Sequence, residues 1–336
     1  MDKDNPRARL YYLFGAKPGA RSLPWPARVP PGLFAVSVGL FGLTGAWRRA
    51  AAYGWPVAAD VAHLMAWPVT AIWVATLLLY LYKCARYPQV VLQEFRHPVQ
   101  SSLQALLPLS MLLAAIILAR PDQGIWLPLV LAALALHALI GYRVVAMLAT
   151  GRLPENAVTP ALYLPIVGGA LVGGMALGTL GYQGWGALLF GTGLSGWALL
   201  EARILSRLFE GPMPEALRPT IGVELAPPAI ATLAAAVIWP DLPGHVLAVG
   251  LGIAVSPIVG VLARLQWWGK VPFSIGFWSF SFPLAALASA IIEAVHRGGW
   301  PQEAGIAALL AASAVIVLLA LRTVALLLQG RLLPAE

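Results

Sequence analysis

The stretch VPFSIGFWSFSFPLAALASA, residues 271–290, decides the fold. It has the length and apolar character of a membrane-spanning helix, yet it contains Pro272 and Pro283. A proline within a helix removes one backbone hydrogen bond, which here frees the carbonyl of Ser279. In lipid such a defect is tolerated only where the carbonyl meets protein or a water-filled cavity. With a rise of about 1.5 Å per residue from Pro272, Phe282 lies about 15 Å deep, near the bilayer midplane.

The composition supports a membrane protein. The chain is 60% hydrophobic and only 11% charged, against about 25% charged residues in soluble domains, and its mean hydropathy is +0.79. The single cysteine, Cys84, excludes an intramolecular disulfide. The net charge of +8 does not indicate nucleic-acid binding, because the basic residues lie between apolar segments. We therefore expect an all-α polytopic membrane protein.

Ten apolar segments follow a basic start, each of a length that a bilayer requires. The predicted helices cover residues 31–47, 57–82, 100–119, 124–147, 160–180, 184–208, 220–240, 245–265, 272–294 and 303–328. Connections from odd to even segments are short and nearly free of cations, whereas those from even to odd are longer and basic. Paired through the short connections, the segments form five helical hairpins.

The positions of the basic residues predict the orientation. Most of the 22 lysines and arginines fall at the even-to-odd connections and the two ends, which places these parts in the cytoplasm. We expect a basic cytoplasmic arm at 1–28, one ten-helix domain at 29–330 and a short cytoplasmic tail at 331–336. The membrane would be a plasma (inner) membrane, with basic residues facing anionic lipid.

An internal repeat marks the odd segments. Each begins after one or two prolines and has a second helix-breaking position further in. The inner positions are Pro108, Pro165, Pro227 and Pro283, with Ser37 in the first segment. The simpler interpretation is that prolines are frequent in membrane helices, but these fall almost wholly in the odd set. The repeat predicts an inner ring of five kinked helices within an outer ring of smoother ones.

Several pieces in order resemble a known family. They are RVPPGLFAVSVGLFGL, FRHPVQSS with LLPLS, YLPIV, LRPTIGVELAPP and FSIGFWSFSFPLAAL. The sequence is similar to the tellurite-resistance/C4-dicarboxylate transporter family over about residues 28–330, nearest to its bacterial TehA branch, and the family also includes plant slow anion channels. The resemblance implies a quasi-fivefold bundle of ten helices, odd helices lining a central pore, and a homotrimer with one pore per subunit. Ser37 departs from the proline of close relatives, which puts the kink of that helix in doubt.

Phe282 is the candidate gate. A phenylalanine in an apolar helix is ordinarily core or lipid-facing filler. Here the neighbouring Pro283, the mid-membrane depth and the family's gate motif, which falls on this residue, favour a ring that blocks a narrow pore sterically and by dewetting. Phe280 lies on a nearly opposite helix face, and Phe34 is a candidate neighbour in the plug.

Uncharged groups would serve an anion in such a pore. The pore-lining candidates are Phe34, Ser37, Pro108, Pro165, Pro227, Ser279 and Pro283. Hydroxyls of Ser110, Thr220 and Ser281 add possible donors, and helix N-termini beyond each break favour negative charge. The alternative for each single hydroxyl is that it satisfies its own backbone.

Glu224 stands within the seventh helix, where an ionisable residue is a functional hypothesis by default. It could be protonated and serve proton coupling, or it could pair with Arg203, Arg207 or Arg264. No histidine or cysteine lies at metal-ligand spacing from another, so we expect neither a metal nor a cofactor.

These observations favour a gated anion channel or facilitator for small inorganic anions such as chloride and nitrate, with tellurite and sulfite as further candidates. The alternative is a proton-coupled C4-dicarboxylate transporter or sulfite exporter, for which Glu224 is the support. No catalytic cluster or nucleotide motif indicates an enzyme.

Overall fold

The computed structural model describes residues 23–119 and 124–333. Most of the predicted basic arm and the last residues of the predicted tail lie outside the described residues. The long helices are α2 (Phe34–Ala52), α3 (Ala58–Arg86), α6 (Leu106–Leu118), α7 (Trp126–Ala149), α8 (Gly169–Thr179), α9 (Gln183–Glu210), α10 (Ala226–Ile238), α11 (Gly244–Ala263), α13 (Ser281–Gly298) and α14 (Gln302–Leu328).

The fold is that of an all-α polytopic membrane protein, as predicted. In the described part of the chain, nine helical segments are long and apolar enough to cross a membrane. The remaining predicted segment forms α2, which is 19 residues long but contains Arg48 and Arg49 near its end. Each predicted helix corresponds to an observed one, with shifts at the ends and with the odd segments divided into two or three parts.

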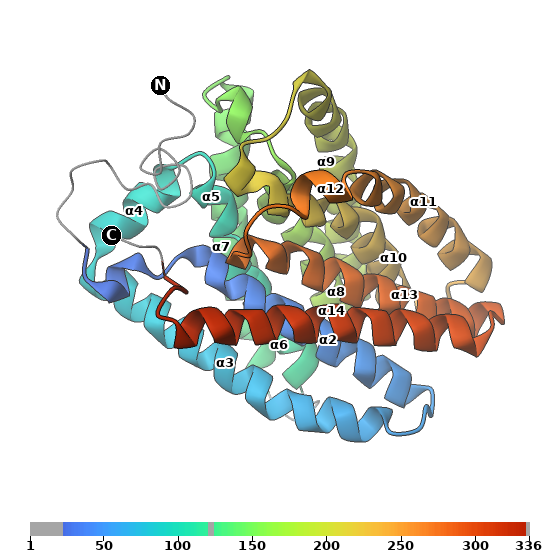
Figure 1. The fold of residues 1–336 in the computed structure, drawn as a ribbon. Coiled ribbons are helices and arrows are strands. Elements are labelled where there is room, and N and C mark those ends of the chain that lie inside the picture. The colour runs from blue at the N-terminus through green and yellow to red at the C-terminus, as the bar shows by residue number, and fades with distance from the viewer. Residues whose placement is uncertain (1–22, 120–123, 334–336) are drawn as a thin grey trace.

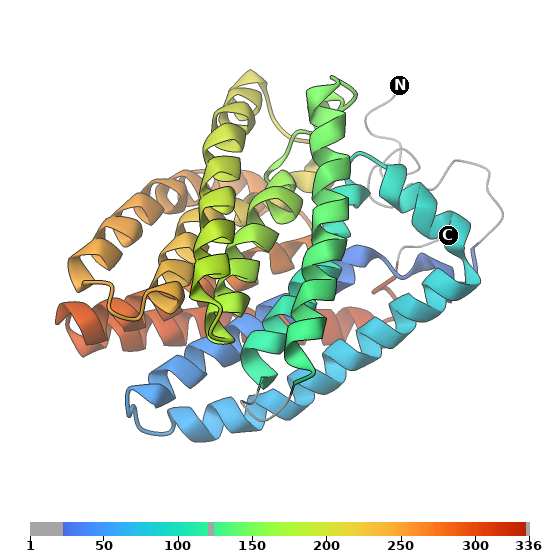
Figure 2. The same ribbon diagram turned by 180° about the vertical axis from the view of Figure 1, so that it is seen from behind.

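Consecutive long helices pair as antiparallel hairpins: α2 with α3, α6 with α7, α8 with α9, α10 with α11, and α13 with α14. Figure 1 shows α14 and α3 at the near side of the bundle, and Figure 2 brings α7 and α9 to the front from behind. The connection from α8 to α9 turns at Gly181, whose φ of 87° is a left-handed conformation that favours glycine.

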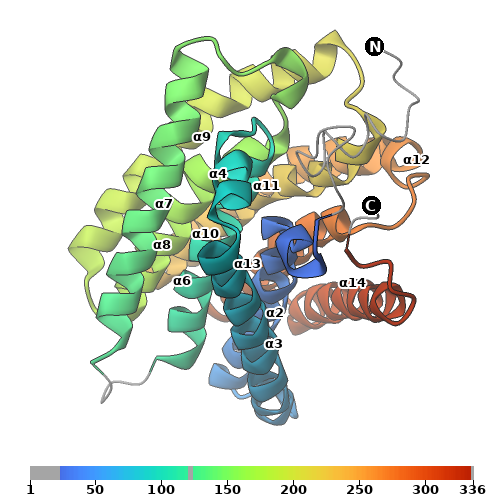
Figure 3. The ribbon, with the colours of Figure 1, turned by 90° about the vertical axis from the view of Figure 1, so that its left-hand side faces the viewer.

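The first helices of the five hairpins form a closed inner ring. Helix α2 packs against α6 and α13, α8 packs against α6 and α10, and α10 packs against α13. Within the nine candidate spans, 61–83% of residues are buried in the four inner spans, against 17–33% in the five outer ones. Figure 3 views the bundle from one end, with α3 and α14 outside α2 and α13. The predicted inner and outer rings are therefore present.

Four of the inner helices are preceded by a 3₁₀ or π segment, and α6 is preceded by a separate short α-helix. These segments are the 3₁₀ turn η2 (Pro31–Leu33), the short helix α5 (Gln100–Leu103), the 3₁₀ turn η4 (Pro160–Leu162) with the π turn η5 (Leu164–Gly168), and the 3₁₀ helices η6 (Glu215–Leu225) and η7 (Ile275–Phe280). The inner prolines Pro108, Pro227 and Pro283 lie in the first turn of α6, α10 and α13. There a proline costs no intrahelical hydrogen bond, since the first N–H groups have no partner in the helix. The predicted mid-helix break is thus a change of winding at the proline.

Two further helices lie in basic connections for which no helix is predicted from the sequence. They are α4 (Pro88–Arg96) and α12 (Leu265–Trp268). Helix α4 is anchored by Glu94, which accepts a hydrogen bond from the fully buried Lys83 at 2.5 Å. Lys83 also donates to the Val29 carbonyl at 2.6 Å. Burial raises the pKa of Glu94 although Lys83 opposes the shift. The pair fixes the connection between α3 and α5 at the base of the inner ring.

Candidate pore and its interruption

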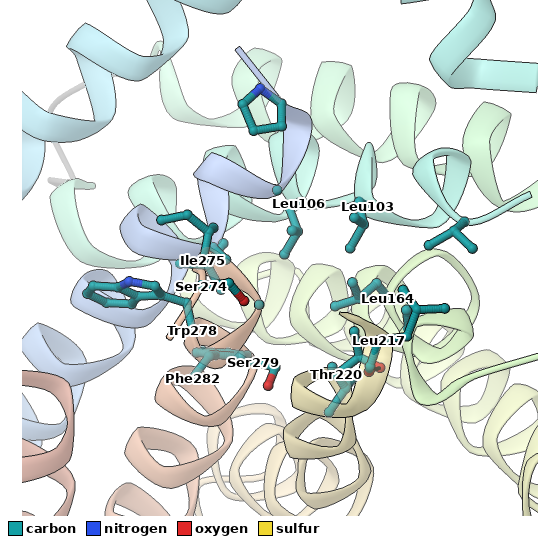
Figure 4. A pocket seen from close by; sticks show the side chains of 18 of the residues that line it. Leu103, Leu106, Leu164, Leu217, Thr220, Ser274, Ile275, Trp278, Ser279 and Phe282 are labelled. Carbon is teal, nitrogen blue, oxygen red and sulfur yellow. Dashed lines mark hydrogen bonds between the residues drawn. The ribbon is translucent and has the colours of Figure 1, made fainter. Parts of the chain in front are cut away.

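A cavity of about 740 Å³ is surrounded by the N-terminal parts of the five inner segments. We call it the N-side cavity. Its walls are mostly apolar, and Figure 4 shows Leu103, Leu106 and Leu164 around it together with Thr220 and Ser279. Residues from the ends of the described chain, among them Trp25 and Leu333, also line it.

The charged groups of the N-side cavity are basic. Arg28 and Arg331 line it, and among its described lining residues there is no carboxylate. Basic residues in an apolar wall attract anions without forming a tight binding site. Such weak binding is compatible with conduction, which requires that an ion be released readily.

A second cavity, of about 440 Å³, lies between the C-terminal parts of α2, α6, α8, α10 and α13. We call it the C-side cavity. Arg48, Arg49, Tyr53 and Glu293 contribute polar groups to a wall that is otherwise largely apolar. The same five inner helices therefore enclose both cavities, one toward each end of the ring.

Phe282 lines both cavities, and it is the residue common to their described linings. Its side chain is 6% exposed. The ring packs against α2 at Gly42, where a Cβ atom would lie 2.7 Å from the Phe282 Cδ2 atom. Because Gly42 has no side chain, the Phe282 ring can occupy the space beside it. Phe280 instead packs on Trp268 of α12, with ring centroids 4.7 Å apart.

The pore-lining candidates divide into two groups. Pro227, Ser279 and Pro283 line the N-side cavity together with Phe282. The described linings do not include four other candidates, namely Phe34, Ser37, Pro108 and Pro165. Phe34 is fully buried and packs edge-on against Tyr80 of α3, with ring centroids 5.6 Å apart, so it lies beside the outer ring rather than beside Phe282.

The hydroxyl groups of Ser110, Thr220 and Ser281 bond to carbonyls of their own segment, which was the alternative interpretation, whereas those of Ser279 and Ser37 do not. Ser110 donates to Leu107 and Thr220 to Leu217. Ser281 donates to Trp278 three residues earlier. Ser279 of η7 donates to the Pro219 carbonyl of the neighbouring segment η6 at 2.5 Å. The Ser37 hydroxyl is buried without a hydrogen-bond partner among the described residues.

Glu224 forms an ion pair with an arginine, which was one of the two roles considered from the sequence. Its carboxylate accepts a hydrogen bond from Arg264 of the α11–α12 connection at 2.8 Å. Glu224 lines neither of the two cavities. This position makes the pair a contact between η6 and its neighbouring hairpin helix.

A second buried carboxylate, Glu293 of α13, was not singled out from the sequence. It is 1% exposed and contacts Arg49, Arg297 and Tyr53. The signal that identified Glu224, an ionisable residue within an apolar segment, applies to Glu293 as well. The arginines could not be located from the sequence, because Arg48 and Arg49 directly follow a predicted span and resemble ordinary flanking charges.

The fold and the two cavities define a class: polytopic all-α membrane proteins in which an inner ring of helices encloses cavities along its axis. Comparison with known proteins gives the family. The chain belongs to the SLAC1 family, described as voltage-dependent anion channel, which it matches over residues 28–325. The protein is accordingly an anion channel or transporter.

Individual relatives agree with this assignment. The chain is 28% identical over 326 residues to the tellurite resistance protein TehA homolog of Haemophilus influenzae, covering 95% of this chain and 97% of that protein. It is 26% identical over 243 residues to the S-type anion channel SLAH2 of Arabidopsis thaliana, covering 69% of this chain and 45% of that protein. It is also 22% identical over 258 residues, 68% of this chain, to an uncharacterized transporter of Methanocaldococcus jannaschii.

Proposed function

We propose that the protein is a gated channel for small inorganic anions such as chloride and nitrate, closed by the ring of Phe282. Tellurite and sulfite are further candidate ions. The observation that carries the proposal is the position of Phe282 between the two cavities, each of which is enclosed by all five inner helices. An ion moving along the ring axis would have to pass this side chain.

The charges along the two cavities support anions as the conducted species. Arg28 and Arg331 line the N-side cavity, and Arg48 and Arg49 line the C-side cavity. Among the described lining residues of the two cavities there is one carboxylate, Glu293 in the C-side cavity. It forms ion pairs with Arg49 and Arg297. A cation would meet four guanidinium groups, so its entry is opposed electrostatically.

The orientation proposed from the basic connections agrees with this arrangement. With the N-side cavity facing the cytoplasm of a bacterial inner membrane, Arg28 and Arg331 lie at its cytoplasmic entrance. The C-side cavity then faces the opposite side.

The test is anion current through purified protein in planar bilayers, comparing wild type with Phe282→Ala. Removing the ring joins the two cavities, so we expect chloride current to rise at least about tenfold. Phe280→Ala is the matched control, because it deletes a buried ring two residues away that lines neither cavity. Its current should stay near that of wild type.

Two results would contradict the proposal. If Phe282→Ala carries no more anion current than empty membranes, the protein is not a channel of this kind. If Phe280→Ala raises the current as much as Phe282→Ala, loosening of the bundle rather than removal of a plug explains the increase.

A further inference from the structure

Glu293 lies three helical turns beyond Phe282 on the same helix, at the wall of the C-side cavity. Three donors converge on its carboxylate. Arg49 of α2 contacts Oε1, Arg297 forms an ion pair with Oε2 at 2.6 Å, and the Tyr53 hydroxyl donates to Oε2 at 2.9 Å. Two guanidinium groups and a hydroxyl surround this one carboxylate. The same donors could bind a small anion in its place, because the anion and the carboxylate both carry negative charge and accept hydrogen bonds.

The donors are held in place by their own contacts. Arg297 also donates to the carbonyl of Ala236 at 3.0 Å, which ties it to the end of α10. The Tyr53 ring stacks on His296 with centroids 3.7 Å apart. Burial raises the pKa of Tyr53 and the nearby Glu293 charge adds to the shift, so the hydroxyl stays protonated and available as a donor.

One of these donors, Arg49, has an N–H group that makes no hydrogen bond among the described residues. This group, at Nε, is buried. Arg49, Tyr53 and Glu293 all line the C-side cavity, which is large enough for an anion with water. Arg48 lines the same cavity and donates to the Ile117 carbonyl.

We propose that Arg49 and Tyr53 form an anion-binding site in the C-side cavity and that the Glu293 carboxylate occupies part of it as a built-in competitor. The inference rests on the proposed channel function and deepens it. A permeating anion would share Arg49 with Glu293 rather than bind it alone. The carboxylate thereby keeps the site weak, as rapid release of an ion requires.

The other buried carboxylate supports this interpretation by contrast. Glu224 accepts from a single arginine, Arg264, and lines neither cavity. Neutralising Glu224 therefore frees no guanidinium toward the axial path. Glu224→Gln and Glu293→Gln form a matched pair, since each removes one charge and nearly no volume from an inner segment.

The first measurement is anion-dependent thermal unfolding of the purified protein, in sodium chloride or sodium nitrate against sodium gluconate at equal ionic strength. An anion bound to the folded state raises Tm by mass action. We expect chloride or nitrate to raise the Tm of Glu293→Gln by about 2–4 °C more than that of wild type or Glu224→Gln. Adding Arg49→Lys to Glu293→Gln should abolish most of that difference.

The second measurement uses conducting protein. In the Phe282→Ala background, the chloride concentration that half-saturates the current should fall at least about threefold on adding Glu293→Gln, and should not change on adding Glu224→Gln. If Glu293→Gln proves too unstable to purify, Arg49→Lys in the same background should raise the half-saturating concentration.

The outcomes separate the two proposals. If Phe282→Ala carries no current while Glu293→Gln gains the thermal response, the site stands and the channel function fails. If Phe282→Ala conducts but Glu293→Gln and Glu224→Gln respond alike to chloride in both measurements, the proposed site is wrong.

Discussion

The two ends of the inner ring are enclosed by the same five segments, yet they differ in backbone and in charge. The N-side cavity, of about 740 Å³, is walled largely by 3₁₀, π and short helical segments. The C-side cavity, of about 440 Å³, is walled by regular α-helices. The wall of the C-side cavity includes the ion pair of Arg49 and Glu293, whereas among the described residues of the N-side wall no carboxylate is present and the hydroxyl groups of Thr220 and Ser279 bond to backbone carbonyls.

The position of the prolines explains the difference. A proline in the first turn allows an α-helix to begin there, so each inner segment can change its winding part-way across the membrane. The irregular part then needs close packing against its neighbours to satisfy its backbone. The regular part satisfies its own backbone, and it can hold charged side chains provided that they are paired.

The largest expected effect tests the charged end. Glu293→Ala leaves Arg49 and Arg297 without their shared carboxylate, and breaking a buried ion pair costs about 3–5 kcal/mol of unfolding free energy. Glu224→Ala should cost less, because its partner Arg264 is 33% exposed and water can compensate. Denaturant titration in detergent measures both. Equal losses would show that the two ends do not differ in this respect.

The next effect tests the packing of the irregular end. Gly222 of η6 lies against η7, and a Cβ atom there would meet the Phe280 backbone nitrogen at 2.8 Å. Backbone cannot move aside as a flexible side chain can, so Gly222→Ala should cost about 1–3 kcal/mol. Gly184→Ala, at a position with open space around it, is the control and should be neutral or slightly stabilising. A neutral Gly222→Ala would mean that η6 and η7 are not tightly packed.

The two rings could be predicted from the sequence, because they depend on patterns along the chain. Apolar length, alternating basic connections and repeated prolines are local signals. Phe282 could be singled out as a candidate because its depth and its proline lie in one short stretch, and it lines both cavities. The charged cluster at the C-side end was missed, since it joins Arg49 and Glu293, which are far apart in sequence and meet only when α2 and α13 pack.

The orientation of side chains on the inner helices was likewise beyond the sequence. Phe34 and Pro108 belong to pore-lining segments, but the described cavity linings do not include them. A repeat identifies which helices face the axis. It does not fix how each helix is rotated about its own axis, because inner helices are apolar all round and lack a polar stripe that would mark one face.

A smaller effect tests the contact between the plug and α2. A methyl group at Gly42 would overlap the Phe282 ring, so Gly42→Ala should cost about 1–2 kcal/mol in the wild-type chain. In the Phe282→Ala background the same change should cost clearly less, because the overlapping ring is gone and the Ala285 Cβ atom, 3.2 Å away, is the close contact that stays. A double-mutant cycle on unfolding free energy measures this coupling. Additive losses would show that the ring does not rest on Gly42.

The smallest effect distinguishes a structural hydroxyl from one that serves the ion. Ser279 of η7 lines the N-side cavity, and its hydroxyl donates to the Pro219 carbonyl of the neighbouring segment η6. Ser279→Ala should lose about 0.5–1.5 kcal/mol of unfolding free energy. Chloride current in the Phe282→Ala background should stay within about twofold of the parent, because the donor is already engaged by the backbone.

Ser289→Ala is the matched control at the regular end. Ser289 lines the C-side cavity, and its hydroxyl donates to Ala285 within its own helix. Such a bond back to the preceding turn contributes little to a helix, so Ser289→Ala should leave the unfolding free energy nearly unchanged. If Ser279→Ala instead reduces current strongly without loss of stability, the hydroxyl acts on the anion. The irregular end would then contribute chemistry to conduction as well as space.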